Sequence, residues 1–296
     1  MIYQVRHTTR LTYTQAINQA RFNLRLMPAT WRGQTLRNYR LTTSPAELRR
    51  QVTSGPYWVV TTQMTYKEPL LGLELSSEFA MEVTAQPDPG PGPRIAEVTQ
   101  AALASRDLSP LGPAPYLFAS QIAVHEDAIA NWAAQFVLAD AGVVDNARAI
   151  MSAIHREFAY IPGATTARTP PGEAFSLRKG VCQDFAHIMI IALRAAGVPT
   201  AYASGYLNTR PPAGRPKLVG ADAMHAWVNV WCGEEHGWIG FDPTNDRLVQ
   251  LDHIQIGMGR DYADVSPIDG TFIGNVLQSV VTTVDVQAAE AAPHQS

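Results

Sequence analysis

The first part of the chain alternates between apolar and polar positions, a pattern typical of strands with one buried face. Tyr3, Val5 and His7 alternate with polar neighbours, and the stretch YWVVTTQMTY is rich in β-branched and aromatic residues. The run QPDPGPGPR at 86–94 follows, and it can continue neither a helix nor a central strand. We therefore predict an N-terminal β-rich domain at residues 1–86 and a linker at residues 86–94.

After the linker the apolar residues recur at helical intervals. Two helices are predicted, one in SQIAVHEDAIANWAAQFVLADAG, ending at Gly142, and one in NARAIMSAIHREFAYIPG, ending at Gly163. A third helix, apolar on nearly all sides and therefore buried, is expected to begin near Cys182 and to end at Gly197, with Pro199 behind it. The period then returns to two in TAYASGYL, MHAWVNVW, GWIGFD and VLQSVVTTVDV. Helices followed by strands favour an α+β fold over a wound βαβ sheet.

These patterns assign residues 94–286 to a second domain, in which the buried helix packs on an antiparallel sheet. The last ten residues, QAAEAAPHQS at 287–296, are expected to form a disordered tail.

The composition is that of an ordinary globular chain, with 296 residues of which 46% are hydrophobic and 17% charged. The net charge of −3 and the scattered arginines provide no basic surface for nucleic acid. No run reaches the roughly 18 apolar residues of a membrane span, and MIYQVRHTTRLTYT lacks the apolar core of a signal peptide. We therefore expect a cytoplasmic protein with neither nucleic acid nor membrane as partner. The sequence leaves the oligomeric state open.

The chain has two cysteines, Cys182 and Cys232, too few for a disulfide framework and without the paired spacing of a zinc ribbon. Cys182 at a helix N-terminus is exposed to roughly half a positive charge from the peptide dipoles, which favours the thiolate. Asp184 in the same turn would oppose the thiolate if it lay close, so it is expected to be a cap or a buried acceptor. Cys232 is expected to be inert.

A histidine and an aspartate on two predicted strands complement the thiol. If MHAWVNVW and GWIGFD form a hairpin with a four-residue connection, Trp231 pairs with His236 and His225 pairs with Asp242. Opposite Cβ atoms lie roughly 4.5–5.5 Å apart, so Asp242 is expected to hold one ring nitrogen of His225. The other nitrogen is then available to Cys182.

Other candidates have weaker support in the sequence. His187 is expected to be a hydrogen-bonded core residue, whereas His125, His155 and His253 carry no motif. Trp227 is a candidate for lining a substrate groove, and packing against the sheet is at least as good an interpretation.

The blocks GVCQDFAHIMIIALRAAGVPTAYASGYL, AMHAWVNVW and GWIGFDPTN, in this order, resemble the bacterial transglutaminase-like superfamily. IYQVRHTTRLTYT, NLRLMP and GRDYADVSPIDG resemble the branch with an N-terminal β domain. The resemblance implies a papain-like core at residues 94–286. It also implies that Cys182 is the nucleophile, His225 the base and Asp242 the group that orients the base.

The resemblance and the residues together predict an enzyme that attacks a carboxamide or peptide carbonyl and forms a thioester on Cys182. Water or an amine resolves the thioester, and the residues do not decide between them, although hydrolysis is slightly favoured. The expected partner is a peptide or protein carboxamide, and no cofactor is expected. Tyr160 is a candidate oxyanion donor beside the backbone N–H of Cys182.

Two other classes of function remain open. One is a catalytically inactive module that binds peptides, and the other is a zinc site built from Cys182, His225 and Asp242.

Overall fold

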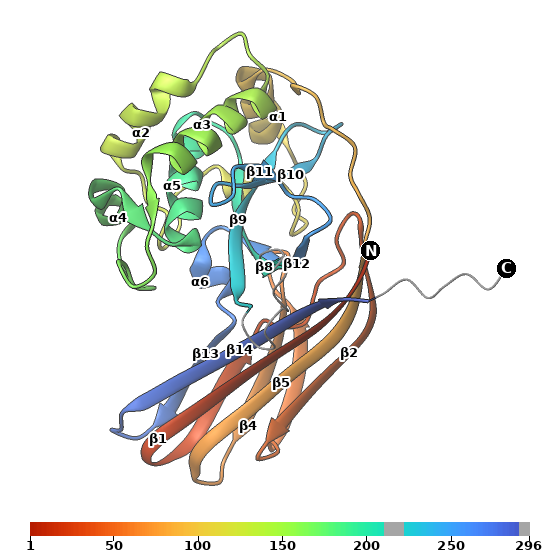
Figure 1. The fold of residues 1–296 in the computed structure, drawn as a ribbon, viewed down its shortest axis with the longest axis vertical. Helices are drawn as coiled ribbons and strands as arrows, with labels where there is room; N and C mark the ends of the chain where they lie inside the picture. The colour runs from red at the N-terminus through yellow and green to blue at the C-terminus, as the bar shows by residue number, and fades with distance from the viewer. Residues whose placement is uncertain (210–221, 290–296) are drawn as a thin grey trace, which may run out of the picture.

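The computed structural model describes residues 1–209 and 222–289 of the 296-residue chain. It has two parts, a helix-rich upper part and a lower part made of long curled strands (Figure 1). In the described part of the chain, no helix has both the length and the apolar character needed to cross a bilayer.

The lower part is an antiparallel sheet built around β1, which pairs with four of the other strands. Its order is β2-β5-β1-β4-β3, and two further strands, β13 and β14, also pair with β1. The alternation seen in the sequence buries one face of β1, including Tyr3 and Val5. The predicted β-rich N-terminal domain is therefore present. The strands named here are β1 (Ile2–Leu24), β2 (Gln34–Ser44), β3 (Arg49–Ser54), β4 (Val60–Tyr66), β5 (Leu70–Val83), β13 (Ile268–Ile273) and β14 (Gln278–Ala288).

The C-terminal strands differ from the expectation that residues 94–286 belong to the second domain. β14 runs along β1, and its Val284 and Val286 are buried in one cluster with residues of the N-terminal strands. The N-terminal sheet therefore includes strands from both ends of the chain. Gln287 and Ala288, placed in the expected tail, belong to β14, while 290–296 lie outside the described residues.

The helical part differs from the sequence prediction in two helices. One of them, α1, was not predicted, and the other, α2, is shorter than predicted. α1 follows the linker directly, and α2 is limited to seven residues and continued by η2. Gly142 is the N-cap of α3 and does not end α2. The glycine makes room for the linker, because a Cβ there would lie 2.0 Å from the carbonyl oxygen of Pro91. The helices are α1 (Ile95–Ala104), η1 (Ala114–Tyr116), α2 (Asp127–Ala133), η2 (Ala134–Phe136), α3 (Val143–Glu157), α4 (Pro171–Leu177), α5 (Cys182–Ala195) and α6 (Tyr262–Val265).

A five-stranded antiparallel sheet of order β11-β10-β9-β8-β12 forms the other layer of this part. α5 contacts β8 and β9 on one side and α2, α3 and α4 on the other, so it is buried, as its apolar sequence predicts. The observed mixed fold confirms the predicted α+β class. The sheet strands are β8 (Thr200–Leu207), β9 (Met224–Trp231), β10 (Trp238–Asp242), β11 (Arg247–Leu248) and β12 (His253–Gly259), and β6 (Ala159–Tyr160) and β7 (Lys179–Gly180) form a short parallel pair.

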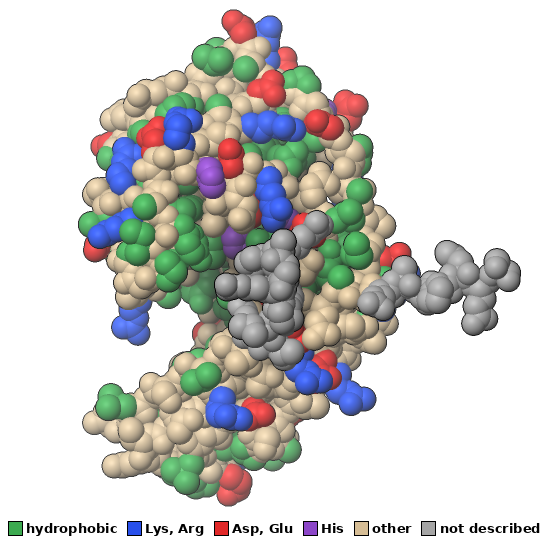
Figure 2. Space-filling view, in the orientation of Figure 1, with side chains coloured by type: hydrophobic (Ala, Val, Ile, Leu, Met, Phe, Trp, Pro, Cys, Tyr) green, Lys and Arg blue, Asp and Glu red, His purple; other side chains and the backbone are tan. Residues whose placement is uncertain are grey.

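The two parts meet along the edge of β12 that faces away from β8. One edge of β12 pairs with β8, and the other receives hydrogen bonds from the N-terminal part. The N–H of Ala29 donates to the carbonyl of Ile256 (3.0 Å), and the N–H of Met258 donates to the carbonyl of Trp58 (2.8 Å). The side chain of Gln34 also accepts from the N–H of Gln255 (2.9 Å). Both parts of the molecule therefore hold β12 in place. Figure 2 shows a hollow between the surfaces of the two parts on one side of the molecule.

Candidate active site

The start of α5 is shaped by a carboxylate that folds back over the preceding loop. Oδ2 of Asp184 accepts from the N–H of Val181 (2.8 Å) and from the hydroxyl of Thr165 (2.6 Å). A Cβ on Gly180 would lie 2.6 Å from this oxygen, so the glycine makes room for the cap. Asp184 is thus a buried acceptor, as expected. Cys182 is the first residue of the helix and is partly exposed, near the unpaired N–H groups of the first turn.

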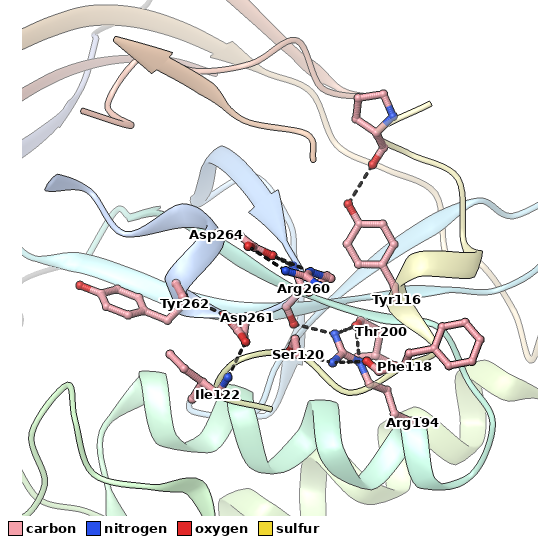
Figure 3. A network of polar contacts seen from close by, with 12 residues as sticks. Tyr116, Phe118, Ser120, Ile122, Arg194, Thr200, Arg260, Asp261, Tyr262 and Asp264 are labelled. Atoms are coloured by element: carbon pink, nitrogen blue, oxygen red, sulfur yellow. Dashed lines mark hydrogen bonds and ion pairs between the residues drawn. The ribbon is translucent and has the colours of Figure 1, made fainter. Parts of the chain in front are cut away.

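The other end of α5 is fixed by Arg194, which points into a network of polar contacts (Figure 3). Its guanidinium donates to the carbonyls of Phe118 (3.0 Å), Thr200 (2.8 Å) and Arg260 (2.6 Å). Asp261 in the same network accepts from the N–H of Ile122 (2.7 Å). The network joins α5, β8 and the segment before α6. The helix that carries Cys182 is therefore fixed at both ends.

His225 at the start of β9 connects the thiol to a buried carboxylate. Its Nε2 lies 2.8 Å from Oδ2 of Asp242, and Cys182 is near enough to influence its charge state. Burial by itself lowers the pKa of His225, but the hydrogen bonds and charges of Asp242 and Cys182 outweigh burial and raise it to about 10. The imidazole is thus stabilised in its protonated form between the thiol and the carboxylate.

The predicted contact between His225 and Asp242 is present, but the predicted strand register is wrong. In the β9–β10 ladder Trp231 pairs with Trp238, not with His236, and Phe241 pairs with Val228. Six residues, 232–237, connect the strands in place of the expected four, and both glycines of the connection have positive φ. A shift by two positions leaves each side chain on its original face of the sheet, so Asp242 still faces His225.

The carboxylate of Asp242 is fully buried and accepts five hydrogen bonds. Its Oδ1 accepts from the N–H groups of Thr244 (3.0 Å) and Asn245 (3.2 Å). Its Oδ2 accepts from the side chain of Asn245 (2.7 Å), from His225 and from His253 (3.1 Å). Burial opposes ionisation, but the bonds from the two histidines prevail and hold the pKa of Asp242 well below its usual range. A carboxylate fixed in this way has one available orientation.

Two of these donors were not identified from the sequence. Asn245 lies three residues after Asp242 in FDPTN, and the turn that begins at Asp242 was a local signal for it. His253 had no such signal, because it comes from β12, which is separated from β10 in the sheet by β9 and β8. Only the three-dimensional fold brings it to Asp242.

Tyr160 and Trp227, the two further candidates, lie in different environments. Tyr160 is 53% exposed, pairs with Gly180 across β6 and β7, and is near enough to Cys182 for the sulfur to help burial raise the phenol pKa. Trp227 is completely buried and packs edge-on against His253, with ring centroids 5.3 Å apart. Trp227 therefore has the packing role and presents no surface to a substrate.

The remaining cysteine and histidine are also enclosed. Cys232 is fully buried, and burial raises the pKa of its thiol. His187 is buried, accepts from the N–H of Tyr262 (3.3 Å), and has its pKa lowered to about 4 by burial. Both environments match those expected.

Among the described residues, His225, Asp242 and His253 form a group with metal-ligand chemistry, their donor atoms all lying within 4.8 Å of one another. Both imidazole Nε2 atoms contact the same carboxylate oxygen, so a metal would have to replace the N–H donors of this arrangement. The set also differs from the zinc set considered from the sequence, which included Cys182.

Comparisons with known proteins extend over the whole chain. The model of the transglutaminase-like superfamily matches residues 130–243, and that of the bacterial transglutaminase-like N-terminal region matches residues 3–82. An uncharacterised protein of Mycobacterium tuberculosis is 36% identical over 293 residues, which cover 96% of this chain and 92% of the relative. A protein-glutamine gamma-glutamyltransferase of Pseudomonas aeruginosa is 41% identical over 93 residues, 30% of this chain and 14% of that protein.

A solved structure, described as that of a proposed cysteine protease from Cytophaga hutchinsonii, has the same fold. It superposes with a TM-score of 0.72 at 21% identity and covers 99% of this chain and 93% of its own. The two matched regions and the full-length relative agree with the architecture described above. This chain therefore belongs to the transglutaminase-like superfamily, with the bacterial N-terminal region in front of its core.

Proposed function

We propose that this protein is a cysteine-dependent enzyme that cleaves or transfers acyl groups at a carboxamide or peptide carbonyl. The observation that carries the proposal is the hydrogen bond between His225 and the buried Asp242, with Cys182 near enough to His225 to raise the pKa of its imidazole. A thiol at a helix N-terminus, an imidazole and an orienting carboxylate are together what nucleophilic acyl transfer requires.

In the first half of the reaction, the Cys182 sulfur attacks the carbonyl carbon as a thiolate. The sulfur–carbon bond forms, and the carbonyl electrons move onto the oxygen. Protonated His225 then gives its proton to the leaving nitrogen as the carbon–nitrogen bond breaks. The products are ammonia or an amine, a thioester on Cys182 and a neutral His225.

In the second half, His225 removes a proton from the acceptor, which attacks the thioester carbon. The sulfur leaves as a thiolate, and His225 is again protonated beside it. With water the acyl product is a carboxylic acid, and with an amine it is a new amide. We propose hydrolysis as the main outcome. The similarity to the glutamyltransferase, which covers 30% of this chain, motivates testing an amine acceptor as well.

The oxyanion of each tetrahedral intermediate needs hydrogen-bond donors on the side of the carbonyl away from His225. We assign this role to the backbone N–H of Cys182 and to the hydroxyl of Tyr160. Tyr160 lies beside Gly180 in the β6–β7 pair, and the N–H of Ile161 donates to the carbonyl of Gly180 (2.9 Å). This pairing holds Tyr160 next to the loop that leads into Cys182.

We further propose that the substrate is a peptide or protein segment. Cys182 is partly exposed, and Tyr160 and Ile161 next to it are 53% and 44% exposed. A partly open site flanked by exposed apolar side chains suits an extended chain that places one carboxamide at the sulfur.

Trapping of an acyl-enzyme tests the proposal. The full chain is incubated with a peptide library rich in glutamine and asparagine side chains, quenched in acid and analysed by mass spectrometry. The expected result is an adduct confined to Cys182 that disappears on addition of hydroxylamine, and no adduct on Cys182→Ala. Peptide binding without an adduct by wild-type protein would instead support the inactive peptide-binding module.

A further inference from the structure

We propose that His253 is a positioning residue that fixes the Asp242 carboxylate in the orientation required by His225. This inference rests on the proposed function, because it concerns the same site. His253 does not face the thiol, and it would act only through Asp242.

The hydrogen bonds of His253 define which of its nitrogens carries the proton. The N–H of Gln250 points at Nδ1 (3.4 Å), which therefore accepts, and this leaves the proton on Nε2. Nε2 lies 3.1 Å from Oδ2 of Asp242 and donates to it. Burial lowers the pKa of His253, so the ring is neutral and the donated bond adds no second positive charge to the site.

His253 is the first residue of β12, and its ring is held by packing and by the strand that it begins. Its side chain is buried, and the ring of Trp227 packs edge-on against it at 5.3 Å. Its strand, β12, pairs with β8 on one edge and is held by Ala29, Trp58 and Gln34 on the other. Because both parts of the molecule hold β12, the Nε2–H group of His253 has a defined position from which it can orient the Asp242 carboxylate.

Oδ2 needs such a donor because Asp242 reaches His225 from a diagonal position in the sheet. Of its three side-chain donors, His225 must change protonation during the reaction, whereas Asn245 belongs to the same turn as Asp242. His253 is the donor that comes from a separate strand and keeps its proton. It therefore holds the carboxylate while the bond to His225 changes.

The ionisable groups around Asp242 come from four elements. His225 faces it from β9, His253 from β12, and Cys182 at the start of α5 lies beyond His225. Arg247 pairs with Asp242 in the β10–β11 ladder and contributes a positive charge that acts on His253. Loss of the hydrogen bond from His253 is thus expected to raise the pKa of Asp242 and so to change the pH dependence of Cys182. Loss of the packing of the His253 ring alone would not have this effect.

The test measures the rate of Cys182 alkylation by iodoacetamide as a function of pH, which requires no known substrate. The full chain is compared with His253→Leu, His253→Gln and His253→Asn. A glutamine places a donor near the position of Nε2, whereas an asparagine is too short and a leucine has no donor. His7→Gln is the matched control, because His7 is also buried and makes two side-chain hydrogen bonds, to Thr9 in β1 and to Tyr206 in β8, and none to Asp242.

We expect alkylation at pH 7 to be about tenfold slower for His253→Leu and His253→Asn, the factor for one hydrogen bond to a charged group. The acid limb of their profiles should move to higher pH, because an Asp242 with one donor fewer protonates more easily. His253→Gln and His7→Gln should follow the wild type.

Two results would overturn the inference. One is a folded His253→Leu whose profile superimposes on that of the wild type. The other, decisive if the leucine variant does not fold, is an equal rate for His253→Gln and His253→Asn. Failure of the proposed function has a different outcome, namely that Cys182 of the wild type reacts no faster than an ordinary thiol.

Discussion

Nε2 of His225 lies 2.8 Å from Oδ2 of Asp242, although the two residues are not directly opposite each other in the strand ladder. Phe241 pairs with Val228, so Asp242 is level with Trp227 and reaches His225 diagonally. Diagonal neighbours are roughly 7–8 Å apart, so the contact depends on how both side chains are oriented. The five donors on Asp242 supply that orientation.

Asp242→Asn should lower turnover by about three to four orders of magnitude while preserving the fold. An amide can turn its oxygen to the two backbone N–H groups or to the side-chain donors, but not to both sets. His225 would then face an N–H group or adopt the wrong tautomer. Steady-state turnover on a substrate identified by acyl-enzyme trapping measures the effect.

Asp246→Asn is the matched control for this change. Asp246 lies in the same turn, is exposed, and accepts from the hydroxyl of Ser152 (2.6 Å). Its loss should leave turnover within about twofold of wild type, since exposed polar contacts contribute little. Similar losses for the two variants would mean that the turn as a whole, and not the Asp242 carboxylate, supports the activity.

The pH profile should retain activity to unusually high pH. Acylation needs His225 protonated to supply the leaving nitrogen with a proton, and Asp242 and Cys182 raise the pKa of His225 to about 10. The imidazolium is present below this value and lost above it, so the alkaline limb of kcat should have its midpoint near pH 10 when acylation limits turnover. In Asp242→Asn the midpoint should fall toward the ordinary histidine value of about 6.5. An alkaline limb unchanged by that substitution would argue against His225 as the proton donor.

The two cysteines should differ in reactivity by a large factor. Cys182 is partly exposed at a helix N-terminus, whereas Cys232 is buried, which raises the pKa of its thiol. Brief iodoacetamide treatment at pH 7, followed by peptide mapping, should label Cys182 and leave Cys232 unmodified. Cys232→Ala should keep the rate of labelling at Cys182. Labelling that is divided between both cysteines in folded protein would contradict the assignment.

The parts of the site that the sequence predicts depend on short-range regularities. The helix from Cys182 follows from a run of apolar residues, and it is found at Cys182–Ala195. The facing of His225 and Asp242 follows from the two-residue period of strands, which is unchanged when the register shifts by two. The register itself depended on the conformation of the connection, whose two glycines allow six residues where four were expected.

The parts that the sequence does not predict depend on long-range packing. His253 contacts Asp242 because four strands fold into one sheet, an arrangement that no local pattern encodes. β14 joins the N-terminal sheet through a similar long-range contact, because it pairs along β1 from the other end of the chain and buries Val284 and Val286 there. Local periodicity therefore identifies strands and faces, but not partners.

His187 should make the protein sensitive to acid. Burial lowers the pKa of His187 to about 4, whereas the unfolded chain has the ordinary value near 6.5. Below pH 6.5 the unfolded state binds the proton more tightly, so stability falls as the pH falls from 6.5 to 4, by about 3 kcal/mol for this residue. Urea denaturation at pH 7 and pH 4.5 measures the free energies of unfolding. The difference between the two should be smaller for His187→Gln, and an unchanged difference would exclude His187 as a source of the acid sensitivity.

Gly180→Ala should disturb the start of α5. The new Cβ would lie 2.6 Å from Oδ2 of Asp184, closer than real Cβ contacts. That carboxylate is held by Val181 and Thr165, so it cannot simply move aside. We expect a destabilisation of about 1–3 kcal/mol, typical of overpacking, and slower alkylation of Cys182 because the helix start shifts.

A double-mutant cycle with Asp184→Ala identifies the cause. Removal of the carboxylate removes the atom that the new methyl group meets, so Gly180→Ala should cost less in the Asp184→Ala background than in the wild type. Free energies of unfolding for the four proteins, from urea titrations at pH 7, provide the coupling. If the two costs simply add, the close approach of Asp184 does not explain the presence of a glycine before Cys182.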